Sequence, residues 1–63
     1  MRVTFYTGLG SQRHEVWIGE LDIVPRAGEE VTWDNGENAR RVDRVTHWLA
    51  TKDNLPLIEI YLR

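Results

Sequence analysis

The residues that could carry out catalysis in this chain of 63 residues are few and scattered. His14 and His47 are its two histidines, the side chains that titrate near neutrality without help, and neither has a partner at a metal-ligand spacing. Glu15 could form an acid–base pair with His14, but successive residues of a strand point to opposite faces. Ser11, the one serine, lacks the strand-to-helix elbow of a nucleophile. We therefore expect no catalytic residue and no metal site.

A cofactor site is equally hard to assemble. The segment Gly8-Leu9-Gly10 has two glycines of a phosphate loop, without the further glycine and the Lys-Ser/Thr pair that contact phosphate and metal. The chain has no cysteine, so disulfides, thiolate zinc sites and cysteine nucleophiles are excluded. We expect a protein that is not an enzyme and that folds without a cofactor.

One spacing favours a binding site. Arg40, Arg44 and Trp48 lie four residues apart, which places them on one side of a helix and on one face of a regular strand, so they are neighbours unless a bulge intervenes. With the adjacent Arg41 they form a candidate partner-binding patch, because tryptophan and arginine are enriched at binding hot spots. The alternative is that Trp48 belongs to the core and the arginines form a solvated face.

The elements that position this patch are mostly strands. Four segments have the composition and alternation of β-strands, at residues 2–7, 15–24, 30–33 and 57–62. In the second, the alternation after Gly19 points Leu21 and Ile23 inward, and the glycine itself predicts a bulge or a bend.

Turn residues separate these strands. Pro25-Arg26-Ala27-Gly28 suits a turn, and Asn35-Gly36 predicts a hairpin with a type I′ turn. In the last strand Ile58, Ile60 and Leu62 share one face, which we expect to be the inner one.

Residues 38–51 decide the fold, because their pattern is ambiguous. On a helical wheel four apolar residues gather on one side, namely Val42, Val45, Trp48 and Leu49. A strand would need a bulge between Val42 and Val45, which have opposite parity, although the composition is β-prone. The sequence thus predicts a small five-stranded barrel, or alternatively three strands, one helix and a final strand.

Size and charge bound the remaining possibilities. A chain of this length forms one domain, residues 1–63, with a small core, for which Trp17, Trp33 and Trp48 are candidates. The net charge of -2 and the pI near 5.5 speak against broad nucleic-acid binding. The sequence has neither the pattern of a leader nor an apolar run of membrane-spanning length, so we expect a cytoplasmic protein.

Three stretches together resemble small SH3-like barrel proteins of bacteria and their phages: 24–36, 42–45 and 57–62. The shared pattern is proline, glycine-acid, valine, glycine and valine-x-x-valine. The chain departs from it at Arg40, where an aromatic residue is usual, and at Asp43, where an aliphatic residue is frequent. The resemblance implies five short strands curled into a barrel that serves as an interaction domain, although a fold alone fixes no function.

These observations lead to three hypotheses for function. The first is a non-catalytic protein-binding module: a bacterial or phage accessory, an inhibitor (for example of a host defence system) or an assembly protein. The second is a small nucleic-acid-binding barrel, which the acidic pI disfavours. The third is a homo-oligomeric structural subunit, because so small a sheet leaves strand edges unpaired.

Overall fold

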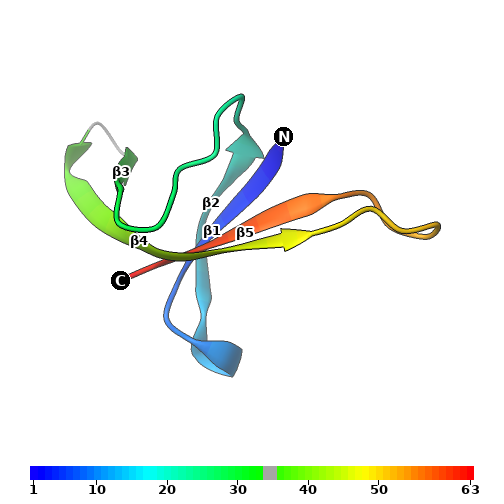
Figure 1. Cartoon of the computed structure of the whole chain (residues 1–63). Helices are drawn as coiled ribbons and strands as arrows, with labels where there is room; N and C mark the ends of the chain where they lie inside the picture. Colours follow the sequence, from blue (N-terminus) through cyan, green and yellow to red (C-terminus); the bar gives the residue numbers. More distant parts are fainter. Residues whose placement is uncertain (34–35) are drawn as a thin grey trace.

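The chain folds into five strands and one 3-10 turn, in a computed structural model that describes residues 1–33 and 36–63 (Figure 1). The elements in chain order are β1 (Arg2–Thr7), η1 (Gly10–Gln12), β2 (His14–Glu20), β3 (Glu30–Trp33), β4 (Asn38–Trp48) and β5 (Leu57–Leu62). The predicted strands at both ends of the chain and at 30–33 are confirmed. The alternative helix within 38–51 is wrong, because this segment is mostly strand.

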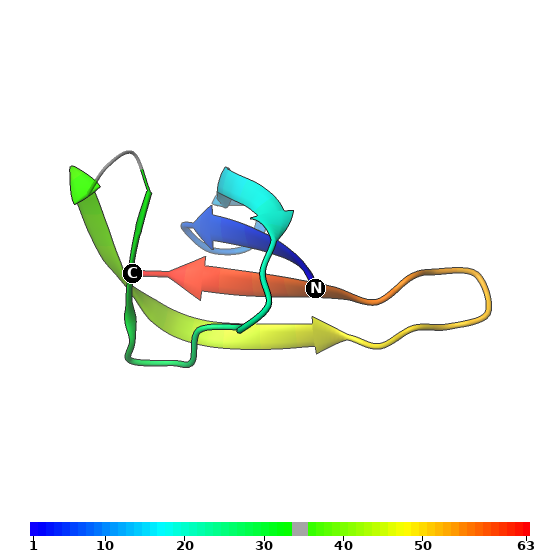
Figure 2. The same ribbon diagram turned by 90° about the horizontal axis from the view of Figure 1, so that it is seen from above.

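The five strands form one sheet in the order β2-β1-β5-β4-β3. β1 pairs with β5 in parallel, and the other neighbours are antiparallel. The sheet curls into a nearly closed barrel whose two edge strands are β2 and β3 (Figure 2). The expected five-stranded, mostly β barrel is therefore confirmed.

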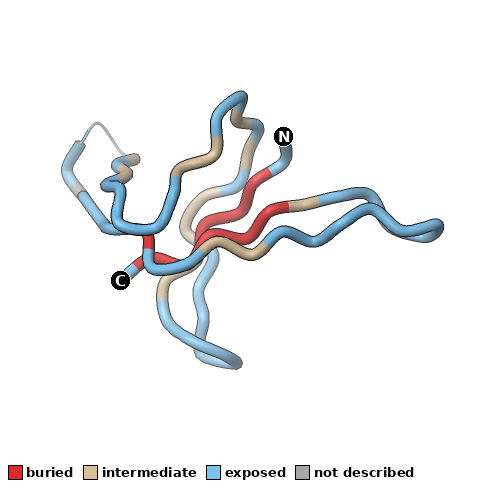
Figure 3. The backbone as a smooth tube through the Cα atoms, viewed as in Figure 1, coloured by how far each residue is buried: buried red, intermediate tan, exposed pale blue. Residues whose placement is uncertain are grey.

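The core lies on the concave side of the curled sheet. Its buried members are Val3, Phe5, Val42, Ile58, Ile60 and Leu62. The alternation of side chains predicts this set, since every second residue of a strand points inward. Burial is concentrated along β1 and β5 (Figure 3), because β5 lies at the centre of the sheet between β1 and β4.

A bulge bends the long strand β4. Val42 pairs with Leu62 and Arg44 with Tyr61, so Asp43 is an extra residue without a partner on β5. The bulge lets Val42 and Val45, which have opposite parity, both pack against the core. The predicted requirement for a bulge between these two valines is confirmed.

The prediction for residues 15–24 holds only in part. β2 ends at Glu20; beyond it Leu21 packs against the core, whereas Ile23 is 85% exposed, so its predicted inward orientation is wrong. Gly19 stays paired with Val3, and the irregularity in the β1–β2 pairing lies elsewhere, between Phe5 and Tyr6.

Gly19 makes room for an aromatic ring. A Cβ atom at this position would lie 2.6 Å from the Trp17 ring, and that ring meets Phe5 edge-on with 5.4 Å between centroids. Trp17 and Trp33 are partly buried against the core, as predicted. Trp48 is 56% exposed, so its assignment to the core is wrong.

The predicted turns lie where the strands require them. Gly28 adopts a φ of 91° in a turn closed by the bond from the Glu29 N–H to the Arg26 carbonyl. Trp33 pairs with Asn38 across the β3–β4 hairpin. The predicted type I′ geometry depends on Asn35, which lies outside the described residues.

Candidate functional site

The outer face of the sheet carries polar and aromatic side chains over its centre. On β5, Glu59 and Tyr61 point away from the core because they alternate with its isoleucines. Glu59 pairs with Thr4 of β1 and Thr46 of β4, and Tyr61 pairs with Tyr6 and Arg44 in the same way. Six side chains meet here and are named the outer-face cluster: Tyr6, Arg13, Arg44, Trp48, Glu59 and Tyr61.

Glu59 is the hydrogen-bond acceptor at the centre of this cluster. Its Oε1 accepts from Trp48 Nε1 at 2.9 Å and from the Tyr61 hydroxyl at 3.1 Å, and its Oε2 faces Arg13 Nη1 at 3.4 Å. Arg13 also donates to the Tyr61 hydroxyl at 2.6 Å. Glu59 is 8% exposed, and the hydrogen bonds of its carboxylate compensate for the loss of water.

These contacts favour the charged form of the carboxyl group. Burial raises the pKa of Glu59, but the hydrogen bonds from Trp48 and Tyr61 and the charge of Arg13 outweigh it, so the pKa is lowered from its ordinary value. Conversely, burial and the nearby Glu59 carboxylate raise the pKa of Tyr6. These shifts favour the carboxylate form of Glu59 and the neutral form of the Tyr6 hydroxyl.

Arginine and tyrosine side chains stack over the rest of the face. The Tyr6 and Tyr61 rings are stacked with centroids 5.5 Å apart. The Arg13 guanidinium lies 4.4 Å from the Tyr6 centroid, and that of Arg44 lies 4.4 Å from the Tyr61 centroid. Both contacts have cation–π geometry. The stack covers Tyr61, which is only 6% exposed.

Trp48 is the exposed aromatic ring of the cluster. It borders a hollow of about 400 Å³ along the β4–β5 hairpin, which also includes Leu49, Leu55 and Leu57. Leu49 and Leu55 are 80% and 86% exposed. The hairpin thus presents an apolar surface next to the charged cluster.

The four residues predicted to bind a partner are divided among three places. Arg44 and Trp48 belong to the outer-face cluster. Arg40 pairs with Val31, which packs against the core, and shares its face of β4 with Val42. The bulge at Asp43 therefore puts Arg40 on the opposite face from Arg44, and the expected neighbourhood does not form.

Arg41 has a structural contact instead. Its Nη1 donates to the Gly28 carbonyl at 2.8 Å. This hydrogen bond connects β4 with the turn that precedes β3.

The histidines and the serine lie apart from the cluster. His14 begins β2 opposite Thr7, His47 lies on β4 opposite Ile58, and Ser11 lies in the exposed 3-10 turn. Within residues 1–33 and 36–63, no three side chains of histidine, aspartate or glutamate gather as metal ligands would. The described part of the chain also has no helix with the length and apolar character of a membrane span.

Sequence reasoning missed Tyr6, Arg13, Glu59 and Tyr61. A signal for two of them was available, because the inward assignment of Ile58, Ile60 and Leu62 places Glu59 and Tyr61 outward by alternation. The parallel pairing that brings Tyr6 to Tyr61 joins the two ends of the chain and has no local signature.

Comparison with known protein families, with curated proteins and with solved structures found no match for this chain.

Proposed function

We propose that this protein is a non-catalytic protein-binding module that contacts its partner through the outer-face cluster and the adjoining β4–β5 hairpin. An accessory, inhibitory or assembly role in a bacterium or phage is part of the proposal. That part rests on the residue pattern similar to SH3-like barrels, carried here by a nearly closed five-stranded barrel.

The observation that carries the proposal is the state of Trp48. Trp48 is 56% exposed, yet its Nε1 donates a 2.9 Å hydrogen bond to Glu59. An exposed aromatic side chain normally loses rotamer freedom on binding, at a cost of roughly 0.5–1.5 kcal/mol. Because Glu59 already orders the indole, much of this cost is removed before a partner arrives.

The surroundings of Trp48 define the chemistry of the partner. Leu49 and Leu55 provide apolar area beside the indole, while Arg44 and Arg13 add positive charge above the tyrosines. A complementary protein surface has an apolar side chain for the hollow and carboxylates facing the arginines.

The other two classes are weaker candidates. Nucleic-acid binding on a sheet face uses exposed rings on which bases stack, but Tyr61 is covered by Arg44 and only 6% exposed. A homo-oligomer is favoured by one observation: among the described residues, β2 and β3 are edge strands, each paired with one neighbouring strand of the sheet.

The test compares a wild-type bait with its Trp48→Ala variant in pull-downs from the native host, followed by calorimetry on the recovered partner. We expect the substitution to weaken binding by about 2 kcal/mol or more, as for a hot-spot tryptophan. Folding should persist, because Glu59 keeps its donors Tyr61 and Arg13.

The matched control is Arg40→Ala, an exposed position on the other face of β4. Its affinity should stay within a factor of about two of the wild type. Equal affinity of the wild type and a folded Trp48→Ala variant would contradict the proposal, and circular dichroism of each variant verifies the fold.

A further inference from the structure

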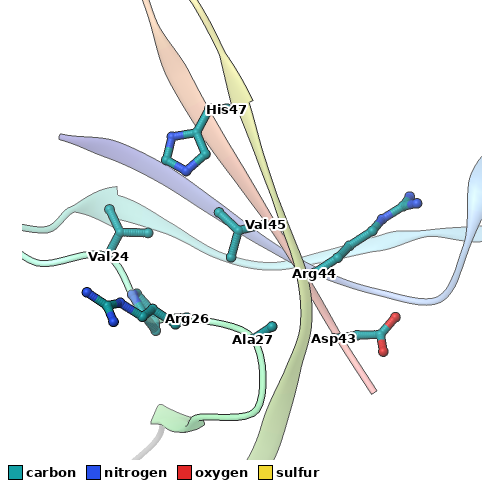
Figure 4. A pocket seen from close by; sticks show the side chains of 8 residues that line it. Val24, Arg26, Ala27, Asp43, Arg44, Val45 and His47 are labelled. Carbon is teal, nitrogen blue, oxygen red and sulfur yellow. The ribbon is translucent and has the colours of Figure 1, made fainter.

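A second concave site lies between β4 and the segment that joins β2 to β3. A groove of about 500 Å³ separates β4 from the β2–β3 connection, residues 21–29. Figure 4 shows Val45 and His47 extending from β4 toward Val24 and Arg26 of the connection. Asp43 and Arg44 also line the groove, and their side chains extend away from Arg26. The groove shares Arg44 with the outer-face cluster, whereas the other five members of that cluster do not line it.

The walls of this groove are held by backbone contacts. At one end of the connection, the Leu21 N–H donates to the Met1 carbonyl at 2.9 Å. At the other, the Gly28 N–H donates to the Val42 carbonyl at 2.8 Å, and the Val42 N–H donates to the Glu29 carbonyl at 2.8 Å. The groove is therefore preformed, and the second set of bonds joins the connection to β4 and closes this end.

The lining combines an apolar floor with four polar side chains, those of Arg26, Asp43, Arg44 and His47. Val24 and Val45 are half-buried and pack against the core, and Pro25 and Ala27 add further apolar surface. Arg26 on the connection and His47 on β4 stand on opposite walls. A guanidinium presents its N–H groups in a fork that matches the two oxygens of a carboxylate.

We propose that this groove binds the carboxy-terminal residue of a peptide. The terminal carboxylate is held by Arg26, with His47 donating a further hydrogen bond from the other wall, and an apolar side chain lies against Val24 and Val45. A chain end fits better than a continuous segment, because the bonds between Gly28 and Val42 block the passage. The volume lies within the range of about 300–1,000 Å³ that is usual for ligand sites.

The test is a titration of the ¹⁵N-labelled chain with three acetylated peptides, followed by NMR. The probes are Ac-Ala-Ala-Leu as the free acid, the same peptide as the amide, and Ac-Ala-Glu-Leu as the amide, which carries an internal carboxylate. We expect the free acid to produce saturable shifts at Val24, Val45 and His47. Both amides should bind at least about tenfold more weakly, because they lack the terminal charge.

Two variants assign the effect to the groove. Arg26→Gln should weaken binding of the free acid by about tenfold or more, and its turn is retained because the backbone of Arg26 makes the contact with Glu29. Leu9→Ala should bind like the wild type, since Leu9 is exposed and does not line the groove. The proposal is overturned by equal binding of the free acid and either amide, by full affinity in Arg26→Gln, or by the absence of saturable shifts.

Discussion

The two sides of strand β5 are buried to nearly the same extent by different means. On the inner side Ile58 and Ile60 are 2% and 0% exposed, and on the outer side Glu59 and Tyr61 are 8% and 6% exposed. The curl of the sheet covers the isoleucines. Side chains that project from a loop and from neighbouring strands cover the outer pair.

The two sides therefore differ in what they can contribute: the inner side stabilises the fold, and the outer side orders side chains that can contact a partner. The inner side is stabilised by apolar side chains that are buried together, so its contribution to the free energy of unfolding depends on close packing. The outer side is held by hydrogen bonds that converge on Glu59, and these fix side chains that still reach solvent, such as Trp48. A face ordered in this way can bind a partner with little further loss of entropy.

Substitution of a residue on the inner side of β5 should give the largest loss of stability. Ile60→Ala removes a fully buried side chain from the central strand and should lower the free energy of unfolding by about 2–5 kcal/mol. The core of a domain below about 70–80 residues rarely supplies more than about 3–5 kcal/mol, so this loss would remove much of the stability. Urea denaturation at 25 °C measures the loss.

The matched control for this substitution is Ile23→Ala, which makes the same chemical change at a side chain that is 85% exposed. It should change the stability by no more than about 0.5 kcal/mol. Similar losses in the two variants would show that the inner side of β5 is not the main source of stability.

Substitution of Glu59 on the outer side of β5 should give an intermediate loss of stability, and this loss should depend on pH. Glu59→Gln keeps the shape of the side chain but removes its charge, which should cost about 1–2 kcal/mol at pH 7 because hydrogen bonds to a charged group are the stronger kind. The folded pKa of Glu59 is lowered, so the contribution of the carboxylate is fully present above its ordinary unfolded pKa. It is lost as the pH falls through the lowered folded pKa.

Denaturation curves of the wild type and Glu59→Gln, recorded from pH 7 downward, test this expectation. The difference between the two proteins should shrink on acidification, since the wild-type carboxyl group then becomes neutral as well. Glu30→Gln, an exposed position on β3, serves as the control and should follow the wild type. A difference that stays constant from pH 7 to pH 3 would mean that the charge of Glu59 does not stabilise the fold.

Local patterns were enough to predict most of the fold. Alternation identified the inner residues Ile58, Ile60 and Leu62, and the opposite parity of Val42 and Val45 led to the bulge. Each of these inferences depends on neighbours within a few residues, where the geometry of a strand leaves little freedom. The inward orientation of Ile23 was predicted incorrectly because β2 ends at Glu20. The alternation of side chains in a strand does not apply to residues beyond that end.

The outer-face cluster was harder to predict because its parts come from distant segments. Arg13 and Tyr61 are separated by 48 residues and meet only through the parallel pairing of β1 with β5. The assumption that Trp48 belongs to the core followed from its size and apolar character. It did not allow for a buried carboxylate that holds the indole N–H on the outside of the sheet.

The smallest expected effect tests how the bulge divides β4. Arg44 lies over the Tyr61 ring, whereas Arg40 shares the opposite face of the strand with Val42. Arg44→Ala should therefore reduce the stability by about 0.5–1 kcal/mol through loss of an exposed cation–π contact.

The coupling between these arginines distinguishes the bulged strand from a regular one. In a regular strand Arg40 and Arg44 would share a face, and their like charges would interact. With the bulge at Asp43 they do not, so the effects of Arg40→Ala and Arg44→Ala on stability should add within about 0.3–0.5 kcal/mol in the double variant. Urea denaturation of the wild type, both single variants and the double variant measures the coupling. A larger interaction energy that weakens as salt is added would place both guanidinium groups on one face after all.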